Sequence, residues 1–375
     1  MMPDTKQKTT RWQRKLRENI CTVEDLKKHL FLTPSEEKLL KNVGELFPIS
    51  ITRHYMSLID KNDKRDPIRR LIVPSAEELD LGGSFDTSGE KKSTRAPGLQ
   101  HKYKQTALIL ATNRCAAYCR FCFRKRLVGL STEEILRRFN DAVRYVRAHK
   151  EITNVLISGG DPFMLPTTVI EEFLKTLSKI KHLSYIRFGS RTPVAFPDRI
   201  LDDGSLTATL KKYSSKNKRI YVVTHFNHPR EINEQSTEGV NRLIAAGVLL
   251  DNQTVLLKGV NDNPDVLAEL MTKLVGIGVT PYYVFQCRPV TGVKNQFQVP
   301  LYSGHLKVEK AKKKLDGHGK RFKYVMSHDT GKIEIVGADT ERLYFKYHQA
   351  RAEKDIGRFF SKKLDKKAAW LDDLE

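Results

Sequence analysis

Cysteine is scarce in this chain, with five residues among 375. So few thiols, and no recognisable secretory leader, argue against a small secreted fold stabilised by disulfides. Long apolar runs are also missing, and no stretch approaches the length that crosses a bilayer. We therefore expect a soluble, cytoplasmic protein without a membrane partner. Its hydrophobic content of 39% is enough for one large domain with extensions.

Acidic residues are also few. The chain has 44 Asp and Glu but 66 Lys and Arg, which gives a net charge of +22. A basic excess can indicate a nucleic-acid partner or an acidic one. The basic residues are dispersed over the whole chain, however, and no nucleic-acid-binding module is recognisable. We interpret the charge as a solvated basic surface and expect no nucleic-acid partner. Part of it could serve an acidic substrate or a reductant of the flavodoxin or ferredoxin type.

Three of the five cysteines lie in one segment with the spacing C-x3-C-x2-C, at Cys115, Cys119 and Cys122. Three thiolates can bind three irons of a 4Fe–4S cluster, which usually has four cysteine ligands. No fourth cysteine is near, so the last iron would stay open for a small molecule. Such an iron can bind S-adenosylmethionine, and an electron from the cluster can then cleave its sulfonium bond to give a 5′-deoxyadenosyl radical. Zinc would need a fourth ligand, and plain buried thiols are a further alternative.

Short β-rich apolar runs alternate with helical patterns from residue 104 onward. This alternation predicts βαβ units and an α/β fold with a parallel sheet. Six units would form a partial (β/α)6 barrel of the TIM type, with its chemistry at the C-terminal ends of the strands. The predicted strands are 106–112, 153–158, 184–188, 219–223, 253–257 and 281–285, and a further strand at 322–326 would extend the wall.

The segments that flank the barrel are expected to be helical or irregular. Residues 11–60 contain two capped helix starts, and the following stretch reads as an irregular arm. Within the barrel, the capping box Ser131-Thr-Glu-Glu134 predicts a helix that continues through Val146. A short, charged helical tail is predicted at the end of the chain. The predicted domains are an N-terminal helical region with an arm (1–98), the barrel (99–337) and the tail (338–375).

Polar residues recur where the predicted strands end. The segment Ser158-Gly159-Gly160-Asp161 follows the second strand, and its glycines allow a ligand to approach the backbone closely. Asp161 could accept a hydrogen bond from an ammonium group, so the segment is well placed for the methionine end of S-adenosylmethionine. Alone, it is also typical of an ordinary βα turn. His225 follows the fourth strand, but a histidine at such a position is more often structural.

A lysine near the C-terminus stands in a glycine-containing turn after a predicted strand, in Thr330-Gly331-Lys332. If Lys332 points into a cavity and is desolvated, its amine becomes a nucleophile that can form a Schiff base with an aldehyde cofactor. An ordinary surface lysine is the alternative that the local sequence leaves open.

Together these features resemble the lysine 2,3-aminomutase family of radical S-adenosylmethionine enzymes, from about Trp12 to about Gly337. The similarity is carried by several long stretches, which include 22–28, 55–60, 97–103, 156–161, 189–193, 224–229, 259–262, 281–283 and 331–333. The resemblance implies the partial (β/α)6 radical S-adenosylmethionine barrel and an isomerase. Its reaction would move the α-amino group of a free amino acid to the β-carbon.

The resemblance also implies cofactors and site residues. Cys115, Cys119 and Cys122 would bind the 4Fe–4S cluster, and Lys332 would bind pyridoxal 5′-phosphate. Tyr103 corresponds to a position near the phosphate, and Arg124 to the residue that holds the substrate α-carboxylate, which suits a bidentate guanidinium. The residues expected around S-adenosylmethionine are Ser158, Gly159, Gly160, Asp161, His225 and Gln253.

This chain departs from the family at the substrate side chain. Where lysine mutases hold the ε-ammonium with two aspartates, it has Arg288 and Ser327, although Asp329 could take the place of the second. A guanidinium would repel an ammonium, so a substrate with a carboxylate, such as glutamate, fits better than lysine. Thr106 replaces a basic residue near the phosphate, for which Lys102 is expected to compensate. No cysteine follows Cys287, so no structural zinc is expected, and Cys21 and Cys287 are interpreted as buried thiols.

Other functions remain open from the sequence. The enzyme could use the same radical chemistry to modify a translation factor, a peptide or an RNA, which the positive charge would help to dock. A non-catalytic iron–sulfur protein that only binds or senses is the other alternative. We expect a small amino acid as the substrate and a homo-oligomer as the assembly.

Overall fold

The parallel strands β3 to β9 form the centre of the protein. The computed structural model describes residues 9–375, so the first eight residues of the predicted N-terminal region lie outside it. Each of these strands pairs in parallel with the next, and the sheet is open because its order runs from β1 to β12 without closing. Their bounds are β3 Thr106–Thr112, β4 Asn154–Gly159, β5 Tyr185–Gly189, β6 Arg219–Thr224, β7 Leu249–Leu256, β8 Thr280–Gln286 and β9 Lys323–Ser327. All seven predicted strands are confirmed, and only β7 begins distinctly earlier than expected.

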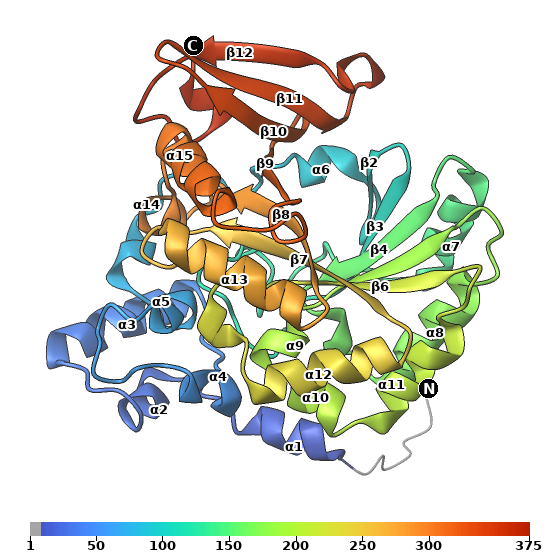
Figure 1. Ribbon diagram of the computed structural model, residues 1–375. Helices are drawn as coiled ribbons and strands as arrows, with labels where there is room; N and C mark the ends of the chain where they lie inside the picture. Colours follow the sequence, from blue (N-terminus) through green and yellow to red (C-terminus); the bar gives the residue numbers. More distant parts are fainter. Residues whose placement is uncertain (1–8) are drawn as a thin grey trace.

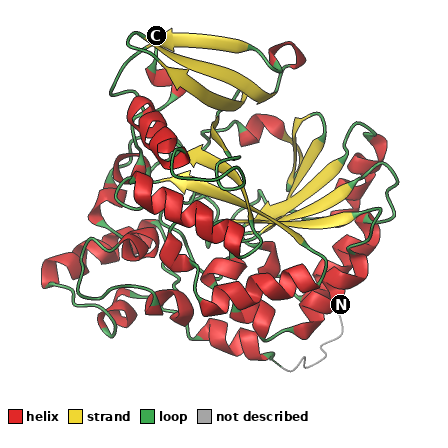
Figure 2. Ribbon diagram, viewed as in Figure 1, coloured by secondary structure: helices red, strands yellow, loops and turns green. Residues whose placement is uncertain are grey.

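Helices between the strands cover the outer face of this sheet (Figure 2). Parallel neighbours need a crossover connection, and a helix with one apolar face provides it. In α8, Ile170, Phe173, Leu174 and Leu177 are buried at helical spacing. The crossover helices are α7 Phe139–Ala148, α8 Thr167–Leu177, α11 Gly204–Tyr213, α12 Glu234–Ala245, α13 Pro264–Gly276 and α15 Leu301–Lys312. Shorter helices are α9 Thr192–Ala195, α10 Asp198–Leu201 and α14 Lys294–Phe297, with 3-10 turns at Pro162–Met164 and Pro229–Glu231.

The N-terminal helices pack beside the barrel, as the blue segments of Figure 1 show. The predicted caps are present, since Thr22 accepts from the amide of Asp25 and Thr33 accepts from the amide of Glu36. The helices are α1 Arg11–Arg17, α2 Val23–Lys27, α3 Pro34–Leu46, α4 Arg53–Ser57 and α5 Pro67–Ile72. The helical expectation for residues 11–60 is therefore confirmed. Cys21 lies on the surface rather than inside, so the prediction of a buried thiol is wrong there and correct for Cys287.

The arm that follows is irregular, as expected, but it contains short elements. These are a 3-10 turn at Ala76–Leu79, the helix α6 Glu90–Ser93 and the strand β1 Thr94–Ala96. β1 pairs with the antiparallel strand β2 Leu99–Tyr103, which follows the arm and pairs in turn with β3. The arm is fastened to the far end of the chain, because Asp329 forms ion pairs with Lys92 and Arg351, both at 3.0 Å. Gly89 has φ +64°, and a Cβ there would lie 1.9 Å from the Asp329 carboxylate.

The predicted helix start at Ser131 is wrong, because α7 begins only at Phe139. The capping box fails since the side chain of Glu134 is taken by Arg126, which donates to it at 2.9 and 2.7 Å. The amide of Leu136 instead donates to the carbonyl of Leu110 at 2.8 Å, which holds this segment in a non-helical conformation. The second half of the predicted apolar stripe does lie in the helix, with Val143 and Val146 buried.

The predicted helical tail is also wrong. The chain ends in an antiparallel sheet of β10 Gly331–Ala338, β11 Arg342–Ala350 and β12 Phe359–Lys363, which lies above the barrel in Figure 1. The reason is an alternating pattern of burial, since Leu343, Phe345 and Tyr347 of β11 are buried between more exposed neighbours. Among the residues described, no helix is long and apolar enough to span a membrane.

Candidate active site

One cavity of about 360 Å³ lies where the parallel strands end. Neighbouring parallel strands end at the same edge of a sheet, so the loops that follow them meet there. All the predicted site residues line this cavity: Lys102, Tyr103, Cys115, Cys119, Cys122, Arg124, Ser158, Gly159, Gly160, Asp161, His225, Gln253, Arg288, Ser327 and Lys332. The structure thus brings together residues that are separated by up to 230 positions, whereas Asp329 pairs with Lys92 and Arg351 instead of lining the cavity.

The cysteine loop follows β3 and is held by the N-terminal region. The amide of Tyr118 donates to Ser50 O and that of Arg120 donates to Leu71 O, both at 2.9 Å. The side chain of Arg120 pairs with the fully buried Glu78, which also pairs with Lys125. These contacts connect the cysteine loop to the N-terminal region.

The three thiols are enclosed, and burial raises the pKa of each, that of Cys122 to about 11. In the part of the chain that the structure describes, no three His, Cys, Asp or Glu side chains converge on a point that would suit one metal ion. A cubane cluster does not require this, because each thiolate binds a different iron. The donor set therefore fits a multi-iron cluster with one open iron.

The glycine segment after β4 lies against the cysteine loop. The amide of Gly160 donates to Thr112 O at 2.6 Å, and a Cβ on Gly160 would lie 2.4 Å from Arg114 O. Only glycine fits so close to another backbone. The Asp161 carboxylate accepts from the hydroxyl of Ser190 and the amide of Arg191, both at 2.8 Å, and also from Thr192 Oγ1 and the amide of Phe163.

Asp161 therefore joins the loop after β4 to the loop after β5. The contact of Asp161 with an ammonium group stays a prediction. For this contact to form, one of the hydrogen bonds that Asp161 accepts would have to break. His225 and Gln253 line the same part of the cavity. Burial, followed by the charge of Arg191, lowers the pKa of His225 to about 3, so the imidazole is neutral at physiological pH.

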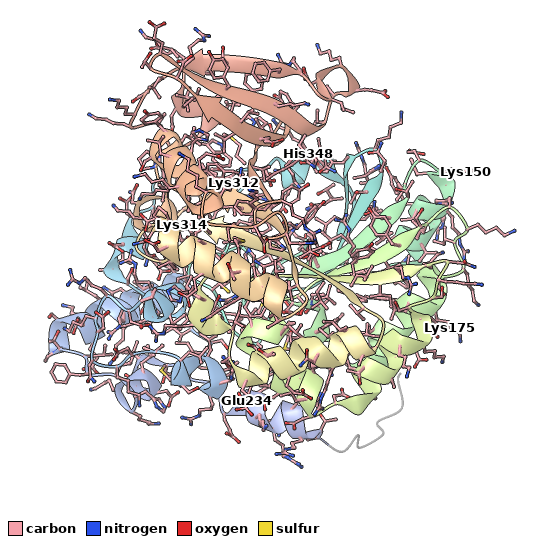
Figure 3. All side chains as sticks on the ribbon, in the orientation of Figure 1. Lys150, Lys175, Glu234, Lys312, Lys314 and His348 are labelled. Atoms are coloured by element: carbon pink, nitrogen blue, oxygen red, sulfur yellow. The ribbon has the colours of Figure 1, made fainter. Side chains whose placement is uncertain are left out.

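Lys332, at the start of β10, points over aromatic rings. Its Nζ lies 4.2 Å from the ring centre of Tyr283 and 5.5 Å from that of Phe285. The Tyr283 hydroxyl bonds to Nε2 of His348 at 2.7 Å, and Figure 3 labels His348 between the C-terminal sheet and the barrel. Burial lowers the pKa of Lys332 to about 7, and the positive charges of Arg187, Arg288 and Lys102 make smaller contributions in the same direction. A neutral amine is thus available at physiological pH, which fits an aldehyde cofactor.

Two residues that share the cavity with Lys332 have buried polar atoms without a partner. The Tyr103 hydroxyl and the Arg187 Nε are buried and have no hydrogen-bond partner. Lys102 is already bonded to the carbonyls of Ser88 and His328, at 2.9 and 2.6 Å. Buried donors without acceptors are costly, so a phosphate that accepts from them fits this end of the cavity.

Arg187 is a residue that the sequence interpretation missed. Its Nη2 donates to Asn154 Oδ1 at 2.6 Å, and Asn154 Nδ2 donates to Thr106 Oγ1 at 3.1 Å. Arg187 is thus linked through Asn154 to Thr106, the position at which this chain lacks the basic residue of the family. A basic residue inside the otherwise apolar strand Tyr185–Gly189 was the available signal.

Two arginines share an aromatic neighbour at another part of the wall. The guanidinium carbons of Arg288 and Arg124 lie 4.0 and 4.6 Å from the ring centre of Phe123. Arg124 donates through Nε and Nη2 to Oε1 of the buried Glu90, at 3.1 and 2.9 Å, and through Nη1 to Ser158 Oγ at 3.2 Å. Arg288 donates to Ser88 Oγ at 2.9 Å. Burial lowers the pKa of Arg288 to about 10, so it stays charged at physiological pH.

The basic surplus is distributed around the outside as well. The exposed Lys150 and Lys175 lie on the right side of Figure 3, and the exposed Lys314 lies toward the left. This distribution agrees with the interpretation of a solvated basic surface.

Comparison with known proteins gives the family. Residues 109–271 match the Radical SAM superfamily. A protein of Aquifex aeolicus (strain VF5) that is named, provisionally, as an L-lysine 2,3-aminomutase is 42% identical over 342 residues, which cover 91% of both chains. The L-lysine 2,3-aminomutase of Clostridium subterminale is 40% identical over 296 residues, 78% of this chain and 70% of that protein. The glutamate 2,3-aminomutase of Clostridioides difficile (strain 630) is 39% identical over 287 residues, 76% of this chain and 66% of that protein. This chain therefore belongs to the lysine 2,3-aminomutase family of radical S-adenosylmethionine enzymes, and it is an isomerase whose radical domain implies a 4Fe–4S cluster and S-adenosylmethionine.

Proposed function

We propose that this enzyme is a 2,3-aminomutase for a free α-amino acid with an anionic side chain, of which glutamate is the first candidate. The observation that carries the proposal is Arg288, a charged guanidinium on the cavity wall whose protein partner is the neutral hydroxyl of Ser88. An ammonium about 4 Å from it would be repelled by about 4 kcal/mol at an effective dielectric constant of about 20. A carboxylate at the same place would be attracted by a similar amount.

The charge balance of the cavity supports an anionic ligand. Arg124, Arg187, Arg288 and Lys102 line it, and Glu90 compensates mainly Arg124 and Arg126. A cofactor phosphate would neutralise the donors near Lys332. Arg288 then needs an anion from the substrate side chain, because Glu90 is already paired.

Arg124 is proposed to hold the α-carboxylate. Glu90, Ser158 and Gly159 O fix the plane of its guanidinium, and one N–H on Nη2 stays available for a second carboxylate. The separation of the two arginines around Phe123 would then select the length of the substrate.

The cofactor residues follow from the fit of the cavity. Cys115, Cys119 and Cys122 would hold the cluster, the segment 158–161 with His225 and Gln253 would hold S-adenosylmethionine, and Lys332 would hold pyridoxal 5′-phosphate. When bound, these groups supply a hydrogen-abstracting radical and a conjugated system that stabilises a substrate radical. The protein keeps Lys332 neutral, orients the substrate with arginines and excludes water. A flavodoxin- or ferredoxin-type reductant and a homo-oligomer stay predictions.

The test is a substrate comparison under anaerobic conditions. The enzyme loaded with its cofactors is given S-adenosylmethionine, dithionite and either glutamate, glutamine or lysine, and β-amino acids are measured by mass spectrometry. We expect glutamate to be preferred, and Arg288→Gln to reduce kcat/KM for glutamate by about 100-fold, as for the loss of a buried charge pair worth about 3 kcal/mol. The exposed Arg144 provides the matched control, Arg144→Gln. Preference for lysine, or an unchanged kcat/KM in Arg288→Gln, contradicts the proposal.

A further inference from the structure

One of the three cluster cysteines accepts a hydrogen bond from a charged side chain. Arg191, in the loop after β5, donates from Nη1 to Cys119 Sγ at 3.1 Å. For Cys115 and Cys122, the donors near the sulfur are backbone amides, those of Asp161 and Arg124. The charges of Arg124 and Lys125 also act on Cys122, but neither side chain donates to its sulfur. The environment of the three sulfurs is therefore asymmetric.

Arg191 is held firmly in this position. Its Nε donates to His225 O at 3.2 Å, and its Nη2 donates to the Tyr55 hydroxyl at 2.8 Å and to Glu231. The guanidinium also faces the rings of Tyr55 and Phe121, with its carbon 4.9 and 5.6 Å from their centres. The side chain is only 10% exposed. Every nitrogen of the guanidinium thus has a partner, and the N–H that faces the sulfur cannot easily turn away.

Glu231 fixes the network from the other side. Its side chain is fully buried, and Oε2 accepts from the amides of Asn227 and His228 at 2.5 and 3.0 Å. Its other oxygen accepts from Tyr55 and Arg191. The carboxylate balances the charge of Arg191, but the hydrogen bond to the sulfur remains.

Reduction adds a negative charge to an iron–sulfur cluster. A hydrogen bond to a ligand sulfur, and a nearby positive charge, stabilise that charge and raise the reduction potential. We infer that Arg191 is a positioning residue that raises the reduction potential of the cluster through its bond to Cys119, with Tyr55 and Glu231 as its supports. This inference depends on the cluster that the family implies, and not on the identity of the amino acid substrate.

The test measures the potential, without substrate or pyridoxal phosphate. Wild-type protein and the variants Arg191→Gln and Arg191→Lys are reconstituted anaerobically, and the one-electron reduction of the cluster is followed by electron paramagnetic resonance. For Arg191→Gln we expect the equilibrium constant of reduction to fall about tenfold, which is about 59 mV for one electron. Arg191→Lys keeps the charge and should shift less. The matched control is Arg187→Gln, which removes a cavity arginine not bonded to a cysteine and should change the potential least.

Equal potentials for wild type and Arg191→Gln, at equal iron content, overturn the inference. If the Arg191 variants fail to assemble the cluster, the test is made on the wild-type protein alone. Its arginines are labelled with ¹⁵N in the guanidinium nitrogens only, because the backbone amide of Arg124 also lies near a cluster sulfur. The reduced cluster is then examined for a hyperfine coupling to this side-chain nitrogen. A coupling supports the bond to Cys119, and its absence rules the bond out.

Discussion

The carboxylate of Glu90 joins Arg124 to Arg126, with one oxygen for each guanidinium. Burial opposes ionisation of Glu90, but the two arginines outweigh it and lower its pKa to about 2. Glu90 belongs to the arm, whereas both arginines belong to the segment after the cluster cysteines. This contact therefore connects the arm to the cysteine loop.

Replacing Glu90 with glutamine leaves the buried guanidinium of Arg124 without its carboxylate partner, whereas Arg126 keeps Glu134. We expect Glu90→Gln to lower the free energy of unfolding by about 3 kcal/mol, as for a broken buried ion pair. Urea unfolding of the apoprotein, followed by circular dichroism, measures the difference. Glu134→Gln is the control, because Glu134 pairs with Arg126 at 41% exposure and should cost less than 1 kcal/mol. Equal losses in the two variants would contradict the assignment.

The same pair predicts a dependence of stability on acid. Because the folded state lowers the pKa of Glu90 from 4.5 to about 2, its contribution is complete above about pH 4.5 and is lost as the pH falls toward 2. Unfolding curves between pH 6 and pH 3 should therefore converge for the wild type and Glu90→Gln. A difference that stays constant over this range would show that ionisation of Glu90 is not involved.

Lys332→Ala should abolish covalent attachment of pyridoxal 5′-phosphate, because the amine that binds the aldehyde is gone. The visible absorption of the bound cofactor should disappear while the iron content of the reconstituted cluster stays the same. Lys102→Ala serves as the control and should keep that absorption with a weaker affinity. Survival of the absorption in Lys332→Ala would move the cofactor to another lysine.

Attachment of the cofactor should depend on pH near neutrality. The pKa of Lys332 is lowered to about 7, so its nucleophilic neutral form increases as the pH rises through 7. The rate at which the visible absorption develops should follow the same curve. Arg187 is the charge that lowers this pKa most after burial, so Arg187→Gln should move the midpoint to higher pH. A rate that is independent of pH between 6 and 8 would mean that Lys332 is not the titrating group.

Arg187 should recognise the phosphate and not the ring of the cofactor. We expect Arg187→Gln to weaken the binding of pyridoxal 5′-phosphate by about 10- to 100-fold. This is the range for a charge-assisted hydrogen bond worth about 1.5–3 kcal/mol. Affinity for pyridoxal, which has no phosphate, should stay the same. Equilibrium titration of both compounds gives the ratio, and equal weakening of the two would place Arg187 elsewhere in the site.

The regular parts of this fold could be predicted from the sequence because their patterns are local. The strands carry β-rich apolar runs, and the caps of Thr22 and Thr33 satisfy amides within three residues. The errors come from competition with distant partners. Arg126 takes the side chain that the capping box at Ser131 needs, and the charged residues of the C-terminal segment obscured the alternating pattern of β11.

The site could be predicted only through motifs that recur in its family. The cysteine spacing indicates a cluster without any knowledge of the fold, whereas Lys332 is one lysine among many until its burial is known. Arg187 was missed, and Arg191 was noted only within the segment 189–193 without a role of its own. The importance of both depends on unpaired or distant atoms, namely the Nε of Arg187 and the sulfur of Cys119. The link from Glu90 to Arg124 could not be predicted for the same reason.

The fastening of the arm to the last sheet has a consequence for protein engineering. A side chain at position 89 would clash with Asp329, so only glycine fits there. Lys92 and Arg351 form ion pairs with the same aspartate. Ser88 and Glu90, which contact Arg288 and Arg124, flank this glycine. A chimaera that takes its substrate specificity from a relative must therefore exchange the arm and the C-terminal sheet together. If only one of them were exchanged, it would pack against a segment from a different sequence.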